Sequence, residues 1–432
     1  MNVGFISLGC SKNLVDTEMF VGLFKKGNFN VVNDPKDADI IVINTCGFIE
    51  SAKEEAINTI LEMAEFKQTG KCKYLIATGC LVKRYKKELA KALPEVDLLV
   101  SVDEYDEMWT KIEKMLGVEE KSKNTLDYMD RVVATGKKTA YLKIAEGCSN
   151  NCTYCAIPSI RGAYISRPMN EVLQEAQRLA DLGYKEIIVI AQDTTKYGID
   201  LYGEPKIAEL LDKICKIEGP EWIRFLYAYP ESISDELIQV VKNNDKICNY
   251  FDIPLQHFSD RVLKRMNRKS DSKSIEKVIG KLRKEIPDVI IRTTMIVGFP
   301  GETEEDFEEL YEFIKRAKFE KLGVFKYSKE DGTPASRLPD QIHYKTKQKR
   351  WNLIMSEQEK ISKTKLKEKI GKTYKALVDS IEGKYIVARS YMDIPDEDGV
   401  IFIENNGNIN EGDFIECEII DVKNYDLIGK LK

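Results

Sequence analysis

Histidine is scarce in this sequence: only His257 and His343 occur among its 432 residues. This scarcity limits the zinc sites that the chain can form and argues against hydrolysis by histidine. The chain also lacks a G-x-G pattern and a G-x-x-x-x-G-K pattern, the usual glycine signatures of nicotinamide enzymes and nucleotide hydrolases. We therefore expect neither of those two enzyme classes.

Long apolar segments are missing as well. No apolar run approaches the length of a membrane span, and no basic region precedes the first apolar stretch, as it would in a secretory signal. We therefore expect a cytoplasmic protein without a membrane partner. Neither sign of charge is in large excess: 66 basic and 71 acidic side chains give a net charge of −5, which argues against extensive coating of nucleic acid.

The first 125 residues or so alternate short apolar runs with amphipathic stretches. This alternation predicts an α/β fold with a doubly wound parallel sheet. The polar, weakly periodic segment 121–138 is expected to be a linker. The expected strands are 3–8, 40–44, 74–77 and 98–102.

Between residue 139 and about residue 340, six further apolar runs alternate with helical patterns. They predict a second parallel α/β unit, either an open sheet or an incomplete barrel. A helix is expected at 345–369, where nine basic and three acidic residues give a net charge of +6. A solvated linker helix explains this charge at least as well as a binding role does. The six expected strands are 141–145, 186–191, 223–227, 250–253, 289–297 and 323–327.

Beyond Gly371 the pattern changes to short alternating strands, which predicts a small OB-like β-barrel. Segment 366–432 carries nine basic and fourteen acidic residues, a net charge of −5, so it is expected to repel phosphate and attract a basic protein. Four acids of one expected loop are the candidates for this attraction: Asp393, Asp396, Glu397 and Asp398. The expected strands are 374–378, 385–388, 400–403, 414–422 and 427–431.

Cys148, Cys152 and Cys155, here called the local triad, follow the expected strand 141–145 directly. They therefore lie at the carboxyl end of a parallel strand, where active sites of such folds gather. Three thiolates can hold three irons of a 4Fe-4S cluster and leave the fourth iron open. A zinc knuckle and a dithiol pair are the alternatives, but zinc needs a fourth ligand that no second C-x-x-C or spaced histidine supplies. The spacing favours the iron-sulfur interpretation.

Cys10, Cys46 and Cys80, here called the distributed triad, each follow an expected strand of the first sheet. Because the carboxyl ends of parallel strands share one edge, the three thiols are expected to converge there and to hold a second cluster. A glycine neighbours each of them, which leaves backbone room for a bulky ligand. The alternative is three half-buried cysteines in ordinary turns. The remaining cysteines are expected to be packing residues: Cys72, Cys215, Cys248 and Cys417.

Around these cysteines the sequence resembles the methylthiotransferases, a radical S-adenosylmethionine (SAM) family, over essentially its whole length. The stretches SLGCSKNLVDTE (7–18), INTCGFI (43–49) and CAIPSIRG (155–162) are similar to the branch that modifies a ribosomal protein. The tRNA-modifying branches typically carry other residues there. The resemblance implies three domains: a cluster domain at 1–125, a radical SAM partial (β/α)6 barrel with a linker helix at 134–365, and a TRAM barrel at 366–432.

By this resemblance the distributed triad binds an auxiliary 4Fe-4S cluster and the local triad binds the radical-generating one. The implied reaction is β-methylthiolation of an aspartate in small-subunit ribosomal protein twelve. It uses two SAM molecules, one as methyl donor and one cleaved to a 5′-deoxyadenosyl radical. Such chemistry is required because no side-chain base removes a proton from that β-carbon at a useful rate. The implied partners are the basic ribosomal protein, an external electron donor and a sulfur donor, and the chain is expected to be a monomer.

Residues at the strand ends of the second unit are candidates for the SAM pocket, although ordinary strand-end polar residues explain each of them about equally well. These candidates are Gln192, Asp193, Gln256, Gly298 and Pro300. Two other functions compete with the ribosomal-protein enzyme. A tRNA methylthiotransferase is favoured by the basic helix but disfavoured by the acidic barrel. A non-catalytic iron-sulfur electron carrier would need no SAM pocket.

Overall fold

The computed structural model describes residues 1–118, 124–136, 138–405 and 407–432. Of the linker expected at 121–138, residues 121–123 and 137 lie outside the described residues. By packing, the chain divides into two compact units. Unit 1 contains Met1–Gly136, Ala145–Ile165 and Ser328–Ser336, and unit 2 contains Lys137–Ile144, Ser166–Tyr327 and Arg337–Lys432. The segment that bears the local triad thus packs in the same unit as the N-terminal sheet.

Unit 1 is built on a five-stranded parallel sheet with the order β2-β1-β3-β4-β5. In this order the chain leaves β1 toward one side for β2 and returns to the other side for β3. The crevice between β1 and β3 is therefore the switch point at which sheets of this kind bind ligands. The strands are β1 (Asn2–Ser7), β2 (Asn30–Val31), β3 (Ile40–Thr45), β4 (Tyr74–Gly79) and β5 (Leu98–Ser101).

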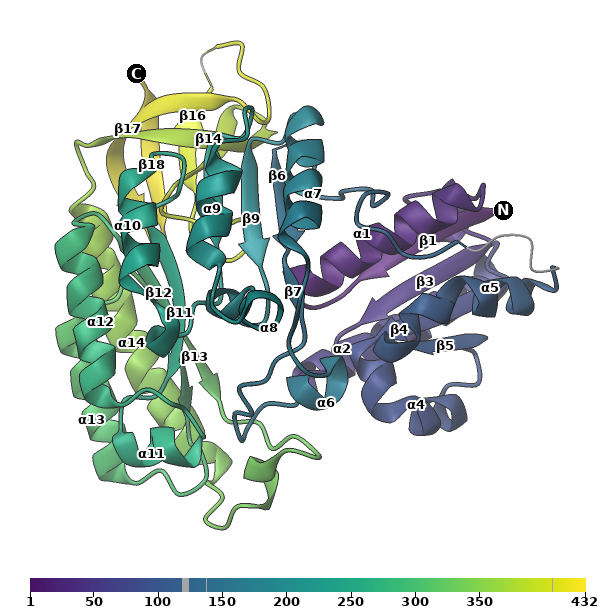
Figure 1. Cartoon of the computed structure of the whole chain (residues 1–432), viewed down its shortest axis with the longest axis horizontal. Helices are drawn as coiled ribbons and strands as arrows, with labels where there is room; N and C mark the ends of the chain where they lie inside the picture. Colours follow the sequence, from purple (N-terminus) through teal and green to yellow (C-terminus); the bar gives the residue numbers. More distant parts are fainter. Residues whose placement is uncertain (119–123, 137, 406) are drawn as a thin grey trace. The chain divides into compact units, whose positions relative to one another are not determined.

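Helices cover both faces of this sheet, so the predicted doubly wound fold is confirmed (Figure 1). Alternate residues of β3 supply the two cores: Ile41 and Ile43 pack with α2 and α4, whereas Ile40 and Val42 pack with α1 and α5. The helices of unit 1 are α1 (Ser11–Lys26), α2 (Glu50–Ala64), α3 (Phe66–Thr69), α4 (Cys80–Ala92), α5 (Met108–Leu116) and α6 (Ile157–Arg161).

Unit 2 contains two three-stranded parallel sheets, β6-β9-β10 and β11-β12-β13. They adjoin at β10 and β11, because Ile223 forms a parallel bridge with Ile247 and the N–H of Ala228 donates to the carbonyl of Asp252 at 2.8 Å. The six predicted strands therefore follow one another as an incomplete parallel barrel. They are β6 (Thr139–Lys143), β9 (Glu186–Ile190), β10 (Trp222–Phe225), β11 (Tyr250–Gln256), β12 (Ile290–Val297) and β13 (Lys321–Lys326).

Amphipathic helices connect these strands, as the right-handed crossover of parallel strands requires. Two short strands that pair with each other bound the segment of the local triad: β7 (Ala145–Glu146) and β8 (Ile165–Ser166). The helices are α7 (Met169–Asp181), α8 (Ile199–Tyr202), α9 (Ile207–Cys215), α10 (Asp235–Asn243), α11 (Asp260–Arg265), α12 (Ser272–Glu285) and α13 (Glu304–Ala317). None of the helices in the described part of the chain is both long and apolar enough to cross a bilayer.

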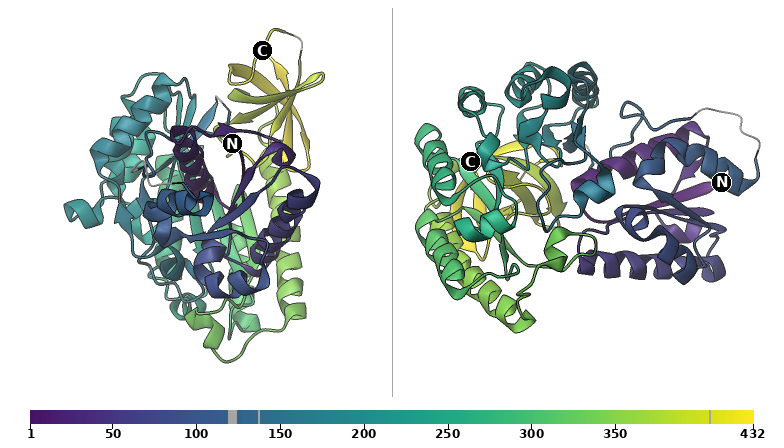
Figure 2. Two further views of the ribbon diagram at one scale, coloured as in Figure 1. Left: turned by 90° about the vertical axis from the view of Figure 1, so that its right-hand side faces the viewer. Right: turned by 60° about the horizontal axis from the view of Figure 1, so that its bottom comes forward.

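The C-terminal strands form a closed barrel with the order β14-β15-β16-β18-β17, drawn in yellow in Figure 2. This confirms the predicted small barrel. Register shifts at Val378/Ser380 and Ile419/Asp421 bend its two longest strands, which helps the sheet to close. The basic helix α14 (Tyr344–Lys367) precedes it, and its strands are β14 (Thr373–Glu382), β15 (Tyr385–Ser390), β16 (Ile401–Glu404), β17 (Phe414–Lys423) and β18 (Asp426–Leu431).

Only two of the four loop acids of this barrel are exposed, as a docking loop would require. Asp393 is buried and accepts from the ammonium of Lys321 at 2.5 Å, and Asp398 accepts from the hydroxyl of Tyr250 at 2.7 Å. Glu397 pairs with Arg292, and only Asp396 is exposed without such a contact. The expected exposure is wrong for Asp393 and Asp398, because strands β13 and β11 bring a cation and a hydroxyl to them, whereas Asp396 and Glu397 are exposed. The charge pattern alone could not reveal those partners.

Candidate functional site

The local triad lies on the loop between β7 and α6. The N–H of Cys148 donates to the carbonyl of Gly162 and the N–H of Cys155 donates to that of Cys152, both at 3.1 Å, so the loop folds back on itself. Gly147 permits this fold: its φ is +69°, and a Cβ there would lie 2.1 Å from the carbonyl oxygen of Ala163. The side chains are sheltered, with Cys148 and Cys152 only 7% and 6% exposed.

The three thiols of this loop share one electrostatic environment. Burial raises the pKa of Cys155 to about 12, and the neighbouring thiols of Cys152 and Cys148 raise it too, whereas the N–H of Ile157 lowers it. Charge on Cys148 or Cys152 therefore disfavours a thiolate at Cys155 in the apoprotein. Bound iron reverses this preference, because a metal cation stabilises thiolates.

The distributed triad is assembled by the sheet of unit 1. Cys10 follows β1 and Cys46 follows β3, so these two residues flank the switch point, and Cys80 follows β4 as the first residue of α4. Gly9 has a φ of +83°, and a Cβ there would lie only 2.9 Å from the sulfur of Cys46. The sequence predicted that Gly9 leaves room beside a ligand. In the structure, Gly9 also lets the turn of Cys10 approach the turn of Cys46 closely.

The thiols of the distributed triad also influence one another. Burial raises the pKa of Cys80 to about 11, and the thiols of Cys10 and Cys46 raise it further, against the lowering effect of Arg161. Burial likewise raises the pKa of Cys46, to which Cys10 adds. The structure therefore brings together the three residues that the sequence placed on one edge.

The donor set of each triad fits an iron-sulfur cluster, since three thiols are the ligands that such clusters take. Among the described residues, no three His, Cys, Asp or Glu side chains lie close enough together to bind one metal ion. In a four-iron cluster each thiolate binds a different iron, so its ligands need not meet at one point.

A buried polar network beside the distributed triad was not predicted from the sequence. The side-chain amide of Asn13 donates to the carbonyls of Leu8 at 3.0 Å and Thr45 at 3.1 Å, and the side-chain amide of Asn44 donates to the carbonyl of Asn13 at 2.8 Å. Asn13 thereby joins the turns that carry Cys10 and Cys46. The available signal was its place on the first turn of a helix that directly follows a strand, where a buried polar residue needs a partner.

The SAM-pocket candidates all lie at the carboxyl ends of strands in unit 2. Gln192 and Asp193 follow β9, Gln256 ends β11, and Gly298 and Pro300 follow β12. Gln192 and Gln256 are half-buried, whereas the other three are buried. The parallel strands therefore place all five on the same edge.

Two of these positions have backbone conformations that fix a turn. Gln256 has a φ of +73° at an irregular point in the register with β12, and Gly298 has the same φ. The N–H of Gly298 donates to the carboxylate of Glu302 at 2.6 Å. The carboxylate of Asp193 accepts from the hydroxyl of Thr195 at 2.5 Å, so Asp193 also shapes its own turn. Both hydrogen bonds lie within the strand-end loops themselves.

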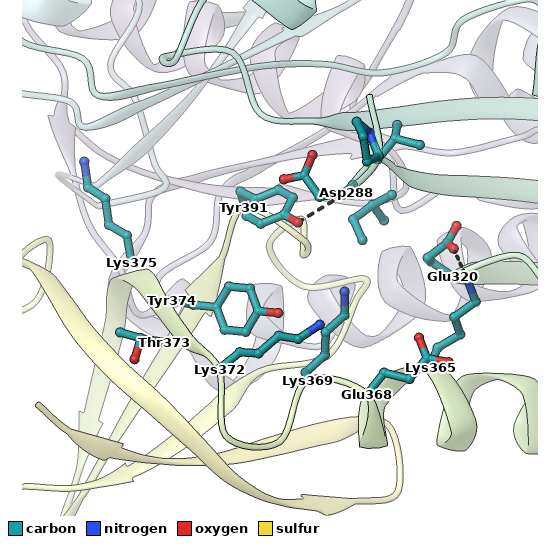
Figure 3. A pocket seen from close by; sticks show the side chains of 13 residues that line it. Asp288, Glu320, Lys365, Glu368, Lys369, Lys372, Thr373, Tyr374, Lys375 and Tyr391 are labelled. Atoms are coloured by element: carbon teal, nitrogen blue, oxygen red, sulfur yellow. Dashed lines mark hydrogen bonds and ion pairs between the residues drawn. The ribbon is translucent and has the colours of Figure 1, made fainter. Parts of the chain in front are cut away.

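A cavity of about 560 Å³ lies at the opposite, amino ends of β12 and β13, beside the end of α14 (Figure 3). Four lysines and three acids line it, and one of these lysines, Lys365, pairs with Glu320 at 2.9 Å. Tyr391 also lines it and donates its hydroxyl to the carbonyl of Asp288 at 3.0 Å. Its charges nearly balance, and it contains none of the residues predicted to bind cofactor.

Three sequence families match this chain. The Radical SAM superfamily matches residues 142–314, the uncharacterized protein family UPF0004 matches residues 2–101, and the TRAM domain matches residues 370–431. A protein of Alkaliphilus oremlandii named ribosomal protein uS12 methylthiotransferase RimO is 63% identical, over 100% of this chain and 99% of the relative. A protein of Lachnoclostridium phytofermentans with the same name is 49% identical, over 99% of each chain.

Solved structures resemble the fold at low sequence identity. The radical SAM methyltransferase TsrM of Kitasatospora setae has a TM-score of 0.57 and 12% identity, over 77% of this chain and 76% of that chain. The cobalamin-dependent SAM radical enzyme OxsB has a TM-score of 0.52 and 14% identity, over 84% of this chain and 56% of that chain. At these identities the likeness concerns the fold alone.

Proposed function

The chain belongs to the family of ribosomal protein uS12 methylthiotransferases named RimO, and from this membership we propose which cluster each cysteine triad binds. It is a radical SAM methylthiotransferase of ribosomal protein uS12 that uses SAM and two 4Fe-4S clusters. Its local triad holds the radical-generating cluster and its distributed triad holds the auxiliary cluster.

One observation carries this assignment: the Radical SAM match at residues 142–314 contains the local triad, and the match to family UPF0004 at residues 2–101 contains the distributed triad. The turns of Cys10 and Cys46 also approach each other closely, because a Cβ at Gly9 would lie 2.9 Å from the sulfur of Cys46. Two separate groups of three thiols are what two clusters with one open iron each require. The four remaining cysteines are Cys72, Cys215, Cys248 and Cys417.

The two clusters supply, when bound, the electron that cleaves SAM and a site that presents sulfur to the substrate carbon. The chain supplies the rest. The local loop shelters Cys148 and Cys152 from water, and Asn13 joins the turns that bear Cys10 and Cys46. The target is the β-carbon of an aspartate, whose C–H bond is beyond the reach of a side-chain base. Holding the reacting groups in place is therefore the main contribution of these residues.

The SAM pocket is proposed at the carboxyl edge of the strands in unit 2. Gln192 and Gln256 contribute side chains, because both are only half-buried there. Asp193, Gly298 and Pro300 contribute the shape of the turns, since Asp193 and Gly298 are engaged in hydrogen bonds of their own loops. The edge that bears all five candidates is the one where parallel folds bind their ligands.

The organisation and the remaining partners are proposals of the same kind. The chain has a cluster domain at 1–125, a radical SAM domain at 134–365 and a TRAM domain at 366–432, a division supported by the extents of the three family matches. It acts as a monomer in the cytoplasm and requires an external electron donor and a sulfur donor.

The test is anaerobic reconstitution with iron and sulfide, followed by incubation with SAM, a reductant and either purified uS12 or tRNA. Mass spectrometry is expected to find a methylthio group on an aspartate of uS12 and none on tRNA. A protein in which alanine replaces the local triad serves as the control. Modification of tRNA in place of uS12 would overturn the proposed substrate.

A further inference from the structure

Arg161 carries a buried positive charge between two elements that border the cysteine triads. It is the last residue of α6, which follows the local triad, and its side chain is 1% exposed. One of its guanidinium nitrogens lies 2.8 Å from the carboxylate of Asp16, and the other donates to the side-chain oxygen of Asn13 at 2.6 Å. Both of these partners lie on α1, the helix that follows Cys10, and the first nitrogen also donates to the carboxylate of Glu146 on β7 at 3.1 Å. The guanidinium therefore joins α6 to α1.

The same guanidinium borders the sulfur of Cys80. Cys80 packs against Ala156 and Ile160 around α6, and its thiol lies 3.7 Å from the Asn13 oxygen that accepts from Arg161. The guanidinium of Arg161 and the thiol of Cys80 therefore meet at the same oxygen of Asn13, so a fixed cation lies beside one sulfur of the distributed triad.

Charge and hydrogen bonds at cysteine sulfur are two of the factors that set the reduction potential of an iron-sulfur cluster. A nearby cation stabilises the more negative, reduced state and so raises the potential. We infer that Arg161 is a positioning residue that fixes α6 against α1 and raises the reduction potential of the auxiliary cluster. This inference rests on the proposed assignment of the distributed triad to that cluster.

The inference predicts that removing the charge of Arg161 and removing the charge of its partner Asp16 shift the reduction potential in opposite directions. Arg161→Met removes the cation and leaves Asp16 beside the site, so the auxiliary potential is expected to become more negative. Asp16→Asn keeps the shape of the side chain but removes its negative charge, so the potential is expected to become less negative. Arg161→Lys keeps the charge but not the two-pronged contact with Asn13 and Asp16, so its negative shift is expected to be smaller.

A second buried ion pair on α1 offers a matched control. Arg131 is fully buried and pairs with Glu18 of α1 at 2.8 Å, as Arg161 pairs with Asp16. The carboxylate of Glu18 also accepts from the N–H of Ala134 at 2.8 Å, so this pair fastens the segment around Arg131 to α1. Arg131→Met is therefore expected to destabilise the fold without changing the potential. A merely structural role of Arg161 would make its variant behave in the same way.

The experiment uses the full chain with alanine at Cys148, Cys152 and Cys155, so that one cluster remains. Redox titrations followed by electron paramagnetic resonance give its midpoint potential in each variant, and thermal unfolding of the apoproteins gives their stability. Opposite shifts for Arg161→Met and Asp16→Asn, with none for Arg131→Met, support the inference. If Arg161→Met fails to take up iron, Arg161→Lys provides the comparison.

Two results would overturn the inference, and they differ from each other. If the background protein binds a cluster but Arg161→Met and Arg161→Lys leave its potential unchanged, Arg161 has no tuning role and the assignment of the triads still stands. If the background protein binds no cluster at all, the assignment of the distributed triad fails, and the inference fails with it.

Discussion

The two cysteine triads reach comparable arrangements by different routes. The local triad fits into one loop, where Gly147 and a backbone hydrogen bond to Gly162 set its shape. The distributed triad needs three strands in the correct order and a polar network around Asn13 to bring its thiols together. A site made by one loop survives changes elsewhere, whereas a site made by a sheet shares the stability of that sheet.

The largest expected effect is the loss of the local triad. Alanine at Cys148, Cys152 and Cys155 is expected to abolish SAM cleavage and methylthiolation completely, because no other group of the chain replaces the radical-generating cluster. Chromatography of 5′-deoxyadenosine and mass spectrometry of uS12 measure the two losses. Cys215→Ala is the control outside both triads and is expected to keep both activities. Persistent cleavage in the triple variant would contradict the assignment.

The corresponding change in the distributed triad is expected to separate the two activities. Alanine at Cys10, Cys46 and Cys80 removes the proposed site of sulfur delivery but leaves the local loop intact, so SAM cleavage continues while methylthiolation stops. The same two assays on one preparation show this split. Full methylthiolation by this variant would mean that the distributed triad has no part in the reaction.

The polar network tests whether the sheet controls the distributed triad. Asn13→Ala removes a buried and a partly buried hydrogen bond from the turns of Cys10 and Cys46, and also the oxygen that accepts from Arg161. This is expected to lower the free energy of unfolding by about 3 kcal/mol. Denaturant unfolding of the apoprotein measures the loss, and the spectrum of each cluster shows which one is weakened. The auxiliary cluster is expected to be weakened before the radical-generating cluster. Asn30→Ala, at an exposed hydrogen bond, is the control with little effect.

The sequence predicted most of the fold because its signals are local. The alternation of apolar residues in β3 and the strand-end positions of the distributed triad follow from periodicity alone. The contacts of Arg161 and of the loop acids did not follow from the sequence. Arg161 meets Asp16 only through tertiary packing, and the loop acids meet Arg292 and Lys321 in the same way. The sequence showed the charges, and the fold determined which of them are paired.

The stability of the apoprotein is expected to depend on pH through the buried thiol of Cys80 in the distributed triad. Burial raises the pKa of Cys80 from its ordinary value of 9.0 to about 11. The folded state therefore holds this proton more tightly than the unfolded state, so the contribution to stability is complete below about pH 9 and is lost as the pH rises toward 11. Between pH 9 and pH 11 the free energy of unfolding of the parent is expected to fall by about 2 kcal/mol more than that of Cys80→Ala. Denaturant curves at pH 8 and pH 11 measure this difference, and equal losses would contradict it.

The most direct test of two separate clusters is the iron content of three proteins after identical anaerobic reconstitution. The parent is expected to bind about eight irons per chain, and each of the two triple alanine variants about four, because each triad carries one four-iron cluster. Four irons in the parent, or the loss of all iron when one triad is replaced, would contradict the account.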